Sequence, residues 1–368
     1  MDYARFMSAG YASFIVGGQF GSEAKGLVAA YIAEQISNPN PRLICTTNAG
    51  AQAGHTTVLA DETKFVCYHL PTVGVLHEMS RIYLNAGSII DLKLLHDEII
   101  RIASVLKRPP GSFWSRMTIH PMATVISDSA KQAEQTGTVQ ATGSTQKGIG
   151  ASLADKVMRH PYAVFRSHRA IFPWAKMADM DLNYETTLVE VPQGTGLSLN
   201  SSGFYPKVTS RECWIGQAMA DAGIHPSRLG KVNMVVRTFP IRVGHIYDPD
   251  GSVVGHSGPF YYDGEEISWN FLTGIKPERT TVTNRVRRIA RWSRQQYQHA
   301  LRMNRPDNVF LTFVNYCTPV ELRQIVNAMR HDESIAGLDP KHFYSWGPKV
   351  DEVTDQLEES MLHCTLQR

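Results

Sequence analysis

Near its N-terminus the chain reads Ser13-Phe14-Ile15-Val16-Gly17-Gly18-Gln19-Phe20-Gly21-Ser22-Glu23-Ala24-Lys25-Gly26-Leu27-Val28-Ala29-Ala30. The apolar run at 13–16 predicts a short buried strand, a glycine-rich turn occupies 17–26, and a helix is expected over 27–36. A strand, a tight turn and a helix in this order are typical of an α/β protein with a largely parallel sheet.

The same alternation continues along the chain. A second strand is expected at 42–46, and residues 232–239 and 309–314 predict two later buried strands. Asp91 is expected to cap a helix, because a short acidic side chain can accept a hydrogen bond from a free helical N–H group. The apolar positions of that helix follow helical spacing: Leu92, Leu95, Ile99, Ile102 and Leu106. The chain is therefore predicted to be α/β, with a large mostly parallel β-sheet flanked by helices.

The composition is that of a soluble globular protein. Of 368 residues, 43% are hydrophobic and 19% are charged, which excludes the collagen-like and disordered classes. Lys and Arg number 37 against 34 Asp and Glu, and the net charge of +3 is too small to indicate nucleic-acid or membrane binding by bulk electrostatics.

The cysteines and the lengths of the apolar runs indicate in which cellular compartment the protein is expected. Five cysteines are scattered without a CxxC pair, so neither a zinc site nor a disulfide framework is indicated: Cys45, Cys67, Cys213, Cys317 and Cys364. There is no uninterrupted apolar run near 18 residues, and the N-terminus makes a poor signal peptide. We therefore expect free thiols, no membrane association and a cytoplasmic protein.

The glycine-rich turn favours a phosphate site without deciding it. Glycines let backbone N–H groups close around phosphate oxygens, and the helix N-terminus and Lys25 add positive charge. The turn is not a Walker A motif, because Gln19, Ala24 and Gly26 stand where that motif needs Gly, Gly and Ser or Thr. By composition alone, an ordinary tight turn with a surface lysine is an equally good interpretation.

Several segments, in order along the chain, match the motifs of one family. They read GQFGSEAKG at 18–26, NAGAQAGHT at 48–56, GSTQKGIG at 143–150, DKVMR at 155–159, and QGT at 193–195 with YPKVTS at 205–210. These resemble the motifs GQWGDEGKG, GGHNAGHT, GTTGRGIG, DKVAR and AQGT…YPYVTS of the adenylosuccinate synthetases. The match extends through Arg242-Val243-Gly244, an arginine cluster at 285–288, and Gly347-Pro348. The resemblance implies the P-loop-like adenylosuccinate synthetase fold, in a single domain over 1–368 with peripheral subdomains.

The resemblance also implies an activity. Members of this family are C–N forming ligases that join aspartate to C6 of a purine 5′-monophosphate, using a nucleoside triphosphate and Mg²⁺. They phosphorylate the 6-oxygen first, and the aspartate amine then displaces phosphate. This chemistry needs positive charge around the transferring phosphoryl group and a proton donor near the 6-oxygen.

Roles for individual residues follow from the motif matches. The catalytic positions are Ser22, Lys25, which contacts phosphate, and His55, the general acid; Mg²⁺ is expected at Ser22 and the Gly54 carbonyl. Substrate monophosphate and purine are expected at Ser144, Thr145, Arg159, Gln193, Thr209 and Arg242. The nucleoside triphosphate is expected at Gly21, Glu23, Ala24, Lys25, Gly26, His55, Thr56, Asn315, Gly347 and Pro348. In the family the arginine matched by Arg159 reaches the neighbouring active site, which implies a homodimer.

The arginine cluster has two interpretations. Thr283, Arg285 and Arg287 match the family's aspartate-binding loop, and guanidinium forks suit carboxylates because each can form paired hydrogen bonds. The alternative is a solvated basic helix, since Arg287, Arg291 and Arg294 would share one helical face. We predict that Arg285 and Arg287 bind ligand and that Arg291 and Arg294 lie on the surface.

Ser22 is the most informative departure from the family, which has an aspartate there as the base for purine N1. A serine hydroxyl is a very weak base at neutral pH, but it is smaller and leaves room at the N1/C2 edge, where guanine carries its 2-amino group. The exchange also resembles the phage branch of the family, the 2-aminoadenylosuccinate synthetases, which act on dGMP toward diaminopurine DNA. The expected product is N6-succino-2-amino-2′-deoxyadenylate, and the alternative substrate is IMP. The substitute base is left open between a water molecule and Glu23.

A second departure concerns the phosphate donor. Cellular members read GTP through a TKLD segment, which here is Thr312-Phe313-Val314-Asn315. A carboxylate only accepts hydrogen bonds, whereas Asn315 offers both a donor and an acceptor, which suits adenine. The predicted donor is therefore ATP or dATP. Alternatively, Asn315 only caps the end of a strand.

A nucleotide-binding protein that acts on nucleic acid is the rival from another functional class. The arginine cluster would then be its contact surface, and a strongly basic or aromatic-basic pattern would be expected around it. The net charge of +3 and the single short cluster favour the ligase.

Overall fold

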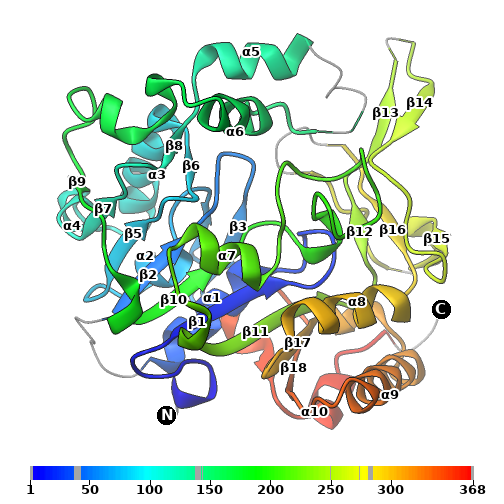
Figure 1. The fold of residues 1–368 in the computed structure, drawn as a ribbon. Helices are drawn as coiled ribbons and strands as arrows, with labels where there is room; N and C mark the ends of the chain where they lie inside the picture. The colour runs from blue at the N-terminus through cyan, green and yellow to red at the C-terminus, as the bar shows by residue number, and fades with distance from the viewer. Residues whose placement is uncertain are drawn as a thin grey trace.

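A ten-stranded sheet forms the centre of the computed structural model, which describes residues 3–36, 43–136, 142, 144–248, 250–272, 274–280 and 285–365 (Figure 1). In spatial order its strands are β19 (Val353–Thr354), β18 (Lys341–Ser345), β17 (Asn308–Thr312), β11 (Leu229–Arg237), β1 (Ala12–Gly17), β10 (Thr186–Glu190), β2 (Leu43–Thr47), β5 (Arg81–Leu84), β7 (Met117–Ile119) and β9 (Lys176–Met177). Neighbouring strands are parallel except for β18 and β19. The predicted large, mostly parallel sheet is confirmed.

The helices of the described residues are α1 (Lys25–Gln35), α2 (Thr72–Leu76), α3 (Leu92–Val105), α4 (Gly111–Trp114), α5 (Asp128–Thr136), α6 (Ile149–Val157), α7 (Ile215–Asp221), α8 (Arg294–Asn304), α9 (Pro319–Ile335) and α10 (Leu357–Met361). Smaller sheets are formed by β12 (Ile241–Arg242), β16 (Arg288–Ala290) and β15 (Glu266–Ile267), and by the pairs β3 (His55–Val58) with β4 (Lys64–Cys67), β6 (Ile89–Ile90) with β8 (Thr124–Val125), and β13 (His245–Tyr247) with β14 (Val253–His256).

Strand β1 is buried on both faces, as expected of a central parallel strand. Its alternating side chains serve two cores: Phe14 packs in a cluster with residues of α7, α8 and α9, whereas Ile15 packs with residues of α1 and α2. Helices therefore cover both faces of the sheet, and β1 delivers the glycine-rich turn at its carboxyl end.

The predicted element boundaries are right to within a few residues. Helix α1 begins at Lys25, two residues before the expected start. The Asp91 carboxylate accepts from the Leu94 N–H at 3.1 Å, which confirms the cap of α3. Strand β11 begins three residues earlier and ends two residues earlier than predicted, and β17 ends at Thr312 because Phe313 turns into the left-handed region at φ 60°. Position 42, the predicted start of β2, lies outside the described residues.

The thiols and helices agree with the composition. All five cysteines are free and buried. Burial raises the pKa of Cys45 and of Cys213 to about 12, so both thiols stay protonated at neutral pH. Within the described ranges, no helix combines the length and the apolar character that a membrane crossing requires.

Candidate active site

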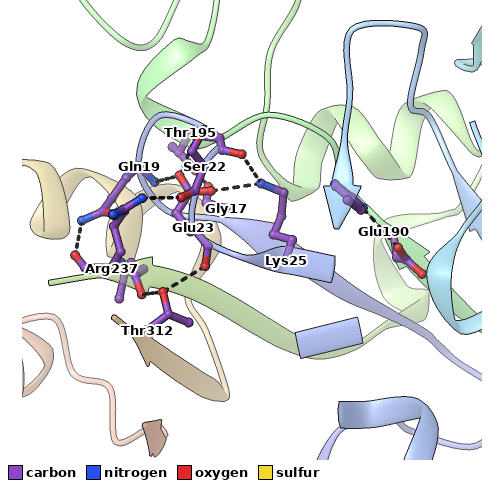
Figure 2. Close-up of polar contacts among 12 residues, drawn as sticks. Gly17, Gln19, Ser22, Glu23, Lys25, Glu190, Thr195, Arg237 and Thr312 are labelled. Carbon is purple, nitrogen blue, oxygen red and sulfur yellow. Dashed lines mark hydrogen bonds and ion pairs between the residues drawn. The ribbon is translucent and has the colours of Figure 1, made fainter. Parts of the chain in front are cut away.

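The glycine-rich turn closes around its own carboxylate. Glu23 is fully buried, and one of its oxygens accepts from the backbone N–H groups of Gln19 at 3.1 Å and Gly21 at 2.6 Å (Figure 2). The turn needs glycine at position 21, where φ is 94° and the chain also passes within close contact of Gln193. Glu23 therefore holds the turn in shape, and its carboxylate is fully engaged there.

Lys25 completes this arrangement. Its ammonium group donates to the second Glu23 oxygen at 3.0 Å and to the Gly21 carbonyl at 3.1 Å, and the side chain is 1% exposed. The Thr312 hydroxyl binds the Glu23 carbonyl at 3.0 Å and so ties the turn to β17. A buried cation at the N-terminus of α1 is well placed to meet an anionic phosphate.

Two cavities open on either side of the turn. Cavity A, of about 360 Å³, takes in the predicted substrate positions Ser144, Thr145, Gln193 and Arg285. Cavity B, of about 380 Å³, takes in predicted triphosphate positions, which are Gly21, Ala24, Lys25, Gly26, His55, Thr56, Asn315, Gly347 and Pro348. The structure thus separates the two sets of predicted residues into two adjoining spaces.

The two cavities share part of their lining. Gly21, Ser22, Gly54, His55 and Arg287 line both of them. Any group transferred from a ligand in one cavity to a ligand in the other would pass these residues. The shared wall contains a hydroxyl, an imidazole and a guanidinium, which can donate hydrogen bonds to a moving anionic group.

His55 is oriented by a carboxylate that the sequence analysis did not single out. Its Nδ1 lies 3.3 Å from Glu190 Oε2, at the end of β10, and the other Glu190 oxygen accepts from the Val73 N–H at 2.9 Å. The His55 Nε2 is buried without a hydrogen-bond partner among the described residues. Because the carboxylate fixes the ring through Nδ1, Nε2 is left as the atom that can exchange a proton with a ligand.

Ser22 lies between two arginines. The Arg287 guanidinium donates to the Ser22 hydroxyl at 3.0 Å, and the Arg237 guanidinium donates to the Ser22 carbonyl at 3.0 Å. Arg237 also forms an ion pair with Glu278. Burial raises the pKa of the Glu278 carboxyl, but the charge and hydrogen bond of Arg237, the Tyr316 hydroxyl and Arg287 together hold the pKa below its ordinary value. Burial lowers the pKa of Arg287, and Glu278 partly offsets this effect. The buried Arg237 and the half-buried Arg287 thus lie near one acidic side chain, and Arg287 brings positive charge to the shared wall.

Aromatic residues form part of the lining of cavity B. Asn315 lies in a short 3-10 turn, Val314–Tyr316, that follows β17, and it lines the cavity with Phe313 and Trp346. The Arg237 guanidinium stacks on Phe313 at 3.8 Å, and the Trp346 ring stacks on His363 at 4.0 Å. An amide among aromatic surfaces suits a heterocyclic base.

Some predicted site residues lie outside both cavities. Glu23 is inside the turn, and the exposed Arg159 and the half-buried Thr209 line neither cavity. Arg242 is buried, and its guanidinium donates to the carbonyls of residues 207, 257 and 259; burial next to Arg288 lowers its pKa to about 9. Thr283 lies outside the described residues.

The basic-helix interpretation of the arginine cluster is wrong. Residues 288–290 form strand β16, and α8 begins only at Arg294. Arg288, Arg291 and Arg294 each form an ion pair, with Glu266, Glu265 and Asp332. Within the 285–288 cluster, Arg288 is therefore paired with a carboxylate, whereas Arg285 and Arg287 line cavity A, so the cluster does not form the continuous basic helix that the alternative required.

Comparison with known proteins agrees with this geometry. The sequence model of the adenylosuccinate synthetase family matches residues 14–170 and 173–353. The chain belongs to the adenylosuccinate synthetase family. It is 33% identical over 365 residues to the N6-succino-2-amino-2′-deoxyadenylate synthase of Salmonella phage PMBT28, covering 93% of this chain and 96% of that protein. It is 35% identical over 357 residues to the enzyme of the same name from Vibrio phage phiVC8, covering 94% and 97%.

A solved structure from the family is also similar. It is the succinoaminodeoxyadenylate synthetase of cyanophage S-2L, bound to dGMP and to dATP as an energy donor. The TM-score is 0.81 at 29% identity, over 96% of this chain and 99% of that one. The adenylosuccinate synthetase fold predicted from the motifs is confirmed.

The motif analysis of this family member missed two residues that contact the predicted site, Glu190 beside His55 and Arg237 beside Ser22. Each interrupts an apolar strand: Glu190 follows Leu188 and Val189, and Arg237 follows Val235 and Val236. A charged residue at the carboxyl end of a buried parallel strand is a usable signal, because such ends face the ligand site in α/β proteins.

Proposed function

We propose that this family member joins L-aspartate to C6 of dGMP, with ATP or dATP as the phosphate donor. The expected product is N6-succino-2-amino-2′-deoxyadenylate, the precursor of a diaminopurine nucleotide. The observation that carries the proposal is the wall shared by cavities A and B, where Ser22 stands beside His55 and Arg287. A donor in cavity B and a purine monophosphate in cavity A would meet at that wall.

The reaction divides into two balanced steps. In the first, a base takes the N1 proton of guanine, the γ-phosphoryl group passes from the donor to the 6-oxygen, and the nucleoside diphosphate is released. In the second, the aspartate amine attacks C6 and gives up a proton, the C–O bond breaks, and phosphate leaves. Lys25 neutralises charge on the donor's phosphates, and His55 faces the 6-oxygen through Nε2, the ring atom that can pass a proton to it. Arg285 and Arg287 are proposed to hold the aspartate carboxylates.

The residues present are suited to Mg²⁺ bound mainly through phosphate. In the part of the chain that the structure describes, no group of three or more His, Cys, Asp or Glu residues could hold a metal ion. Gly54 and Ser22 line both cavities and offer a carbonyl and a hydroxyl, and Mg²⁺ commonly takes few protein ligands beside phosphate and water. When bound, Mg²⁺ would neutralise charge on the transferring phosphoryl group.

Ser22 is the residue that we propose to determine which purine is accepted. Its hydroxyl accepts from Arg287 at 3.0 Å and adds no negative charge at the N1/C2 edge. Glu23 is excluded as the base in this conformation, because both of its oxygens are engaged inside the turn and it lines neither cavity. A water molecule is the remaining candidate of the two considered.

A phosphate-release assay with Mg²⁺ and aspartate tests the proposal. It crosses IMP, GMP and dGMP with ATP, dATP and GTP, and product masses are measured. Turnover of dGMP with ATP or dATP but not with IMP is expected. Turnover of IMP would instead indicate an ordinary adenylosuccinate synthetase, and activity with GTP alone would contradict the role of Asn315.

Exchanging Ser22 for aspartate should move the preference from dGMP toward IMP. The new carboxylate can act as a base for N1, while its larger size crowds the position of the 2-amino group. We expect the ratio of kcat/KM for IMP to that for dGMP to rise at least about tenfold. Ser22→Asn is the matched control of equal size without charge, and it should gain no IMP activity. Unchanged dGMP turnover with no gain for IMP in Ser22→Asp would show that Ser22 is not the discriminator.

We also propose a homodimer with Arg159 near the partner's site. Arg159 is exposed and follows two exposed apolar side chains, Val157 and Met158, which are 73% and 69% exposed at the end of α6. A third apolar side chain farther along the chain, Ile171, is 70% exposed. Large apolar side chains left exposed in this way favour contact with another protein surface.

Mixing two inactive variants tests this arrangement. Arg159→Ala removes the contribution to the neighbouring site, and His55→Ala inactivates the subunit's own site. Random mixing should restore about a quarter of the wild-type rate, because half of the dimers are then heterodimers with one intact site. Subunit exchange is monitored by mass spectrometry of the intact dimers. Exchange without recovered activity would exclude a shared site.

A further inference from the structure

One wall of cavity A comes from the hairpin β13–β14 and the loop before it. Val243, Gly244, Ile246 and Tyr247 line the cavity there. The two strands of the hairpin pair with each other and with no other strand of the described residues, and the hairpin projects away from the central sheet (Figure 1). Strand β14 of the hairpin therefore has side chains that face solvent, and Val254 among them is 61% exposed.

Ile246 presents a hydrocarbon side chain at this wall of the cavity. Ile246 pairs across the hairpin with Gly255, and a Cβ atom placed on that glycine would lie 3.6 Å from Ile246 Cδ1. Because the residue opposite Ile246 is a glycine, no side chain on the neighbouring strand covers Ile246 or adds a polar group beside it. The Val243 carbonyl already accepts from the Ser257 hydroxyl at 2.5 Å, and Ser257 is 4% exposed. The Val243 carbonyl is therefore already occupied within the protein, and Ile246 contributes only hydrocarbon through its side chain.

The place of the sugar follows if the proposed function holds. The phosphate of a purine monophosphate is expected at Ser144 and Thr145, and its base at Ser22 and Gln193. The sugar joins the two and must lie against the rest of the cavity lining. Gln52 and Tyr68 in that lining carry polar groups, which can serve the 3′-hydroxyl that ribose and deoxyribose share.

We infer that the hairpin wall selects deoxyribose over ribose and that Ile246 is the specificity-determining residue. A 2′-hydroxyl placed against Ile246 would lose its hydrogen bonds to water and gain no partner. A methylene at C2′ instead gains apolar contact there. Rejection of an added hydroxyl by a hydrophobic pocket reaches at most about a hundredfold, so we expect dGMP to be preferred over GMP by about 10- to 100-fold in kcat/KM.

Asparagine substitutions on the two sides of the hairpin test the inference. Ile246→Asn brings a polar group into the cavity and should reduce the dGMP/GMP ratio of kcat/KM about tenfold or more, chiefly by raising the rate with GMP. Val254→Asn makes the same chemical change on the exposed side of the same hairpin, and it should leave the ratio unchanged. Thermal melting of both proteins checks that the fold is kept. If Ile246→Asn does not fold, Ile246→Ala should still lower the ratio, because it opens space beside the sugar.

The outcomes separate this inference from the function on which it rests. An equal loss of activity with both nucleotides in a folded Ile246 variant, or a wild-type ratio near one, would overturn the role of the hairpin while leaving the ligase activity in place. An equal fall of the ratio in Val254→Asn would also overturn it, since the cavity lining would then not be the cause. A wild-type protein that turns over neither dGMP nor GMP would refute the proposed function itself.

Discussion

Replacing His55 by alanine should lower kcat by about 10²- to 10⁴-fold, the range typical of losing a general acid. The affinity for both nucleotides should stay within a few-fold of wild type, because the lost hydrogen bond is made mainly in the transition state. Glu190 holds the ring at Nδ1, and the free Nε2 is the atom that meets the ligand. Steady-state kinetics together with calorimetric titration of each nucleotide would measure the two effects separately.

His342 offers a matched control. Its Nε2 lies 2.9 Å from Glu333, and both side chains are nearly buried, but His342 lines neither cavity A nor cavity B. His342→Ala should therefore lower the melting temperature with little change in kcat. A His55 variant that binds nucleotides far more weakly yet turns over normally would contradict the acid role.

Replacing Lys25 by methionine should have two effects of different origin. Loss of the ammonium group removes a buried positive charge beside the phosphates, and we expect kcat to fall by at least about 10²- to 10³-fold. The change also leaves Glu23 buried without its cation, which typically costs about 3–5 kcal/mol of folding stability. Turnover and urea denaturation would be measured on the same preparation.

The double variant Lys25→Met/Glu23→Gln separates these effects. It removes both buried charges, and its amide can still accept the N–H groups of Gln19 and Gly21. Stability should largely return, but activity should not. Recovery of activity together with stability would mean that Lys25 acts only by keeping the turn folded.

The N-terminal part of the fold was predictable because its signals are local. The apolar run 13–16, the glycines after it and Asp91 each specify a conformation with few neighbours involved. The ends of the later strands were less accurate, because tertiary contacts decide them. Strand β17 stops where Phe313 adopts a left-handed conformation and stacks on Arg237. Arg237 lies 76 positions earlier in the chain, so a local sequence pattern cannot predict this contact.

The site was predictable where motif residues face a cavity and less so where partners come from other strands. Lys25, His55 and Gln193 line the cavities that their motifs indicated. Arg242 also belongs to a matching motif, yet its guanidinium is held by carbonyls and lies 4.5 Å from the centre of the Phe20 ring. A sequence motif shows that a charged residue is present, but the groups that its side chain contacts depend on how distant segments pack.

The contact between α1 and β3 has a consequence for how the enzyme works. A Cβ atom on Gly26 would lie only 2.4 Å from the Thr56 carbonyl oxygen, and the Thr57 hydroxyl donates to the Gly26 carbonyl at 3.2 Å. The segments that carry Lys25 and His55 therefore pack directly against each other, with no room for a larger side chain between them. We expect this contact to keep the ammonium group and the imidazole at a fixed separation, so that little conformational entropy is lost there when nucleotides bind. Closure around the ligands would then come from other parts of the cavity walls, and the charged centre would be preorganised before the nucleotides arrive.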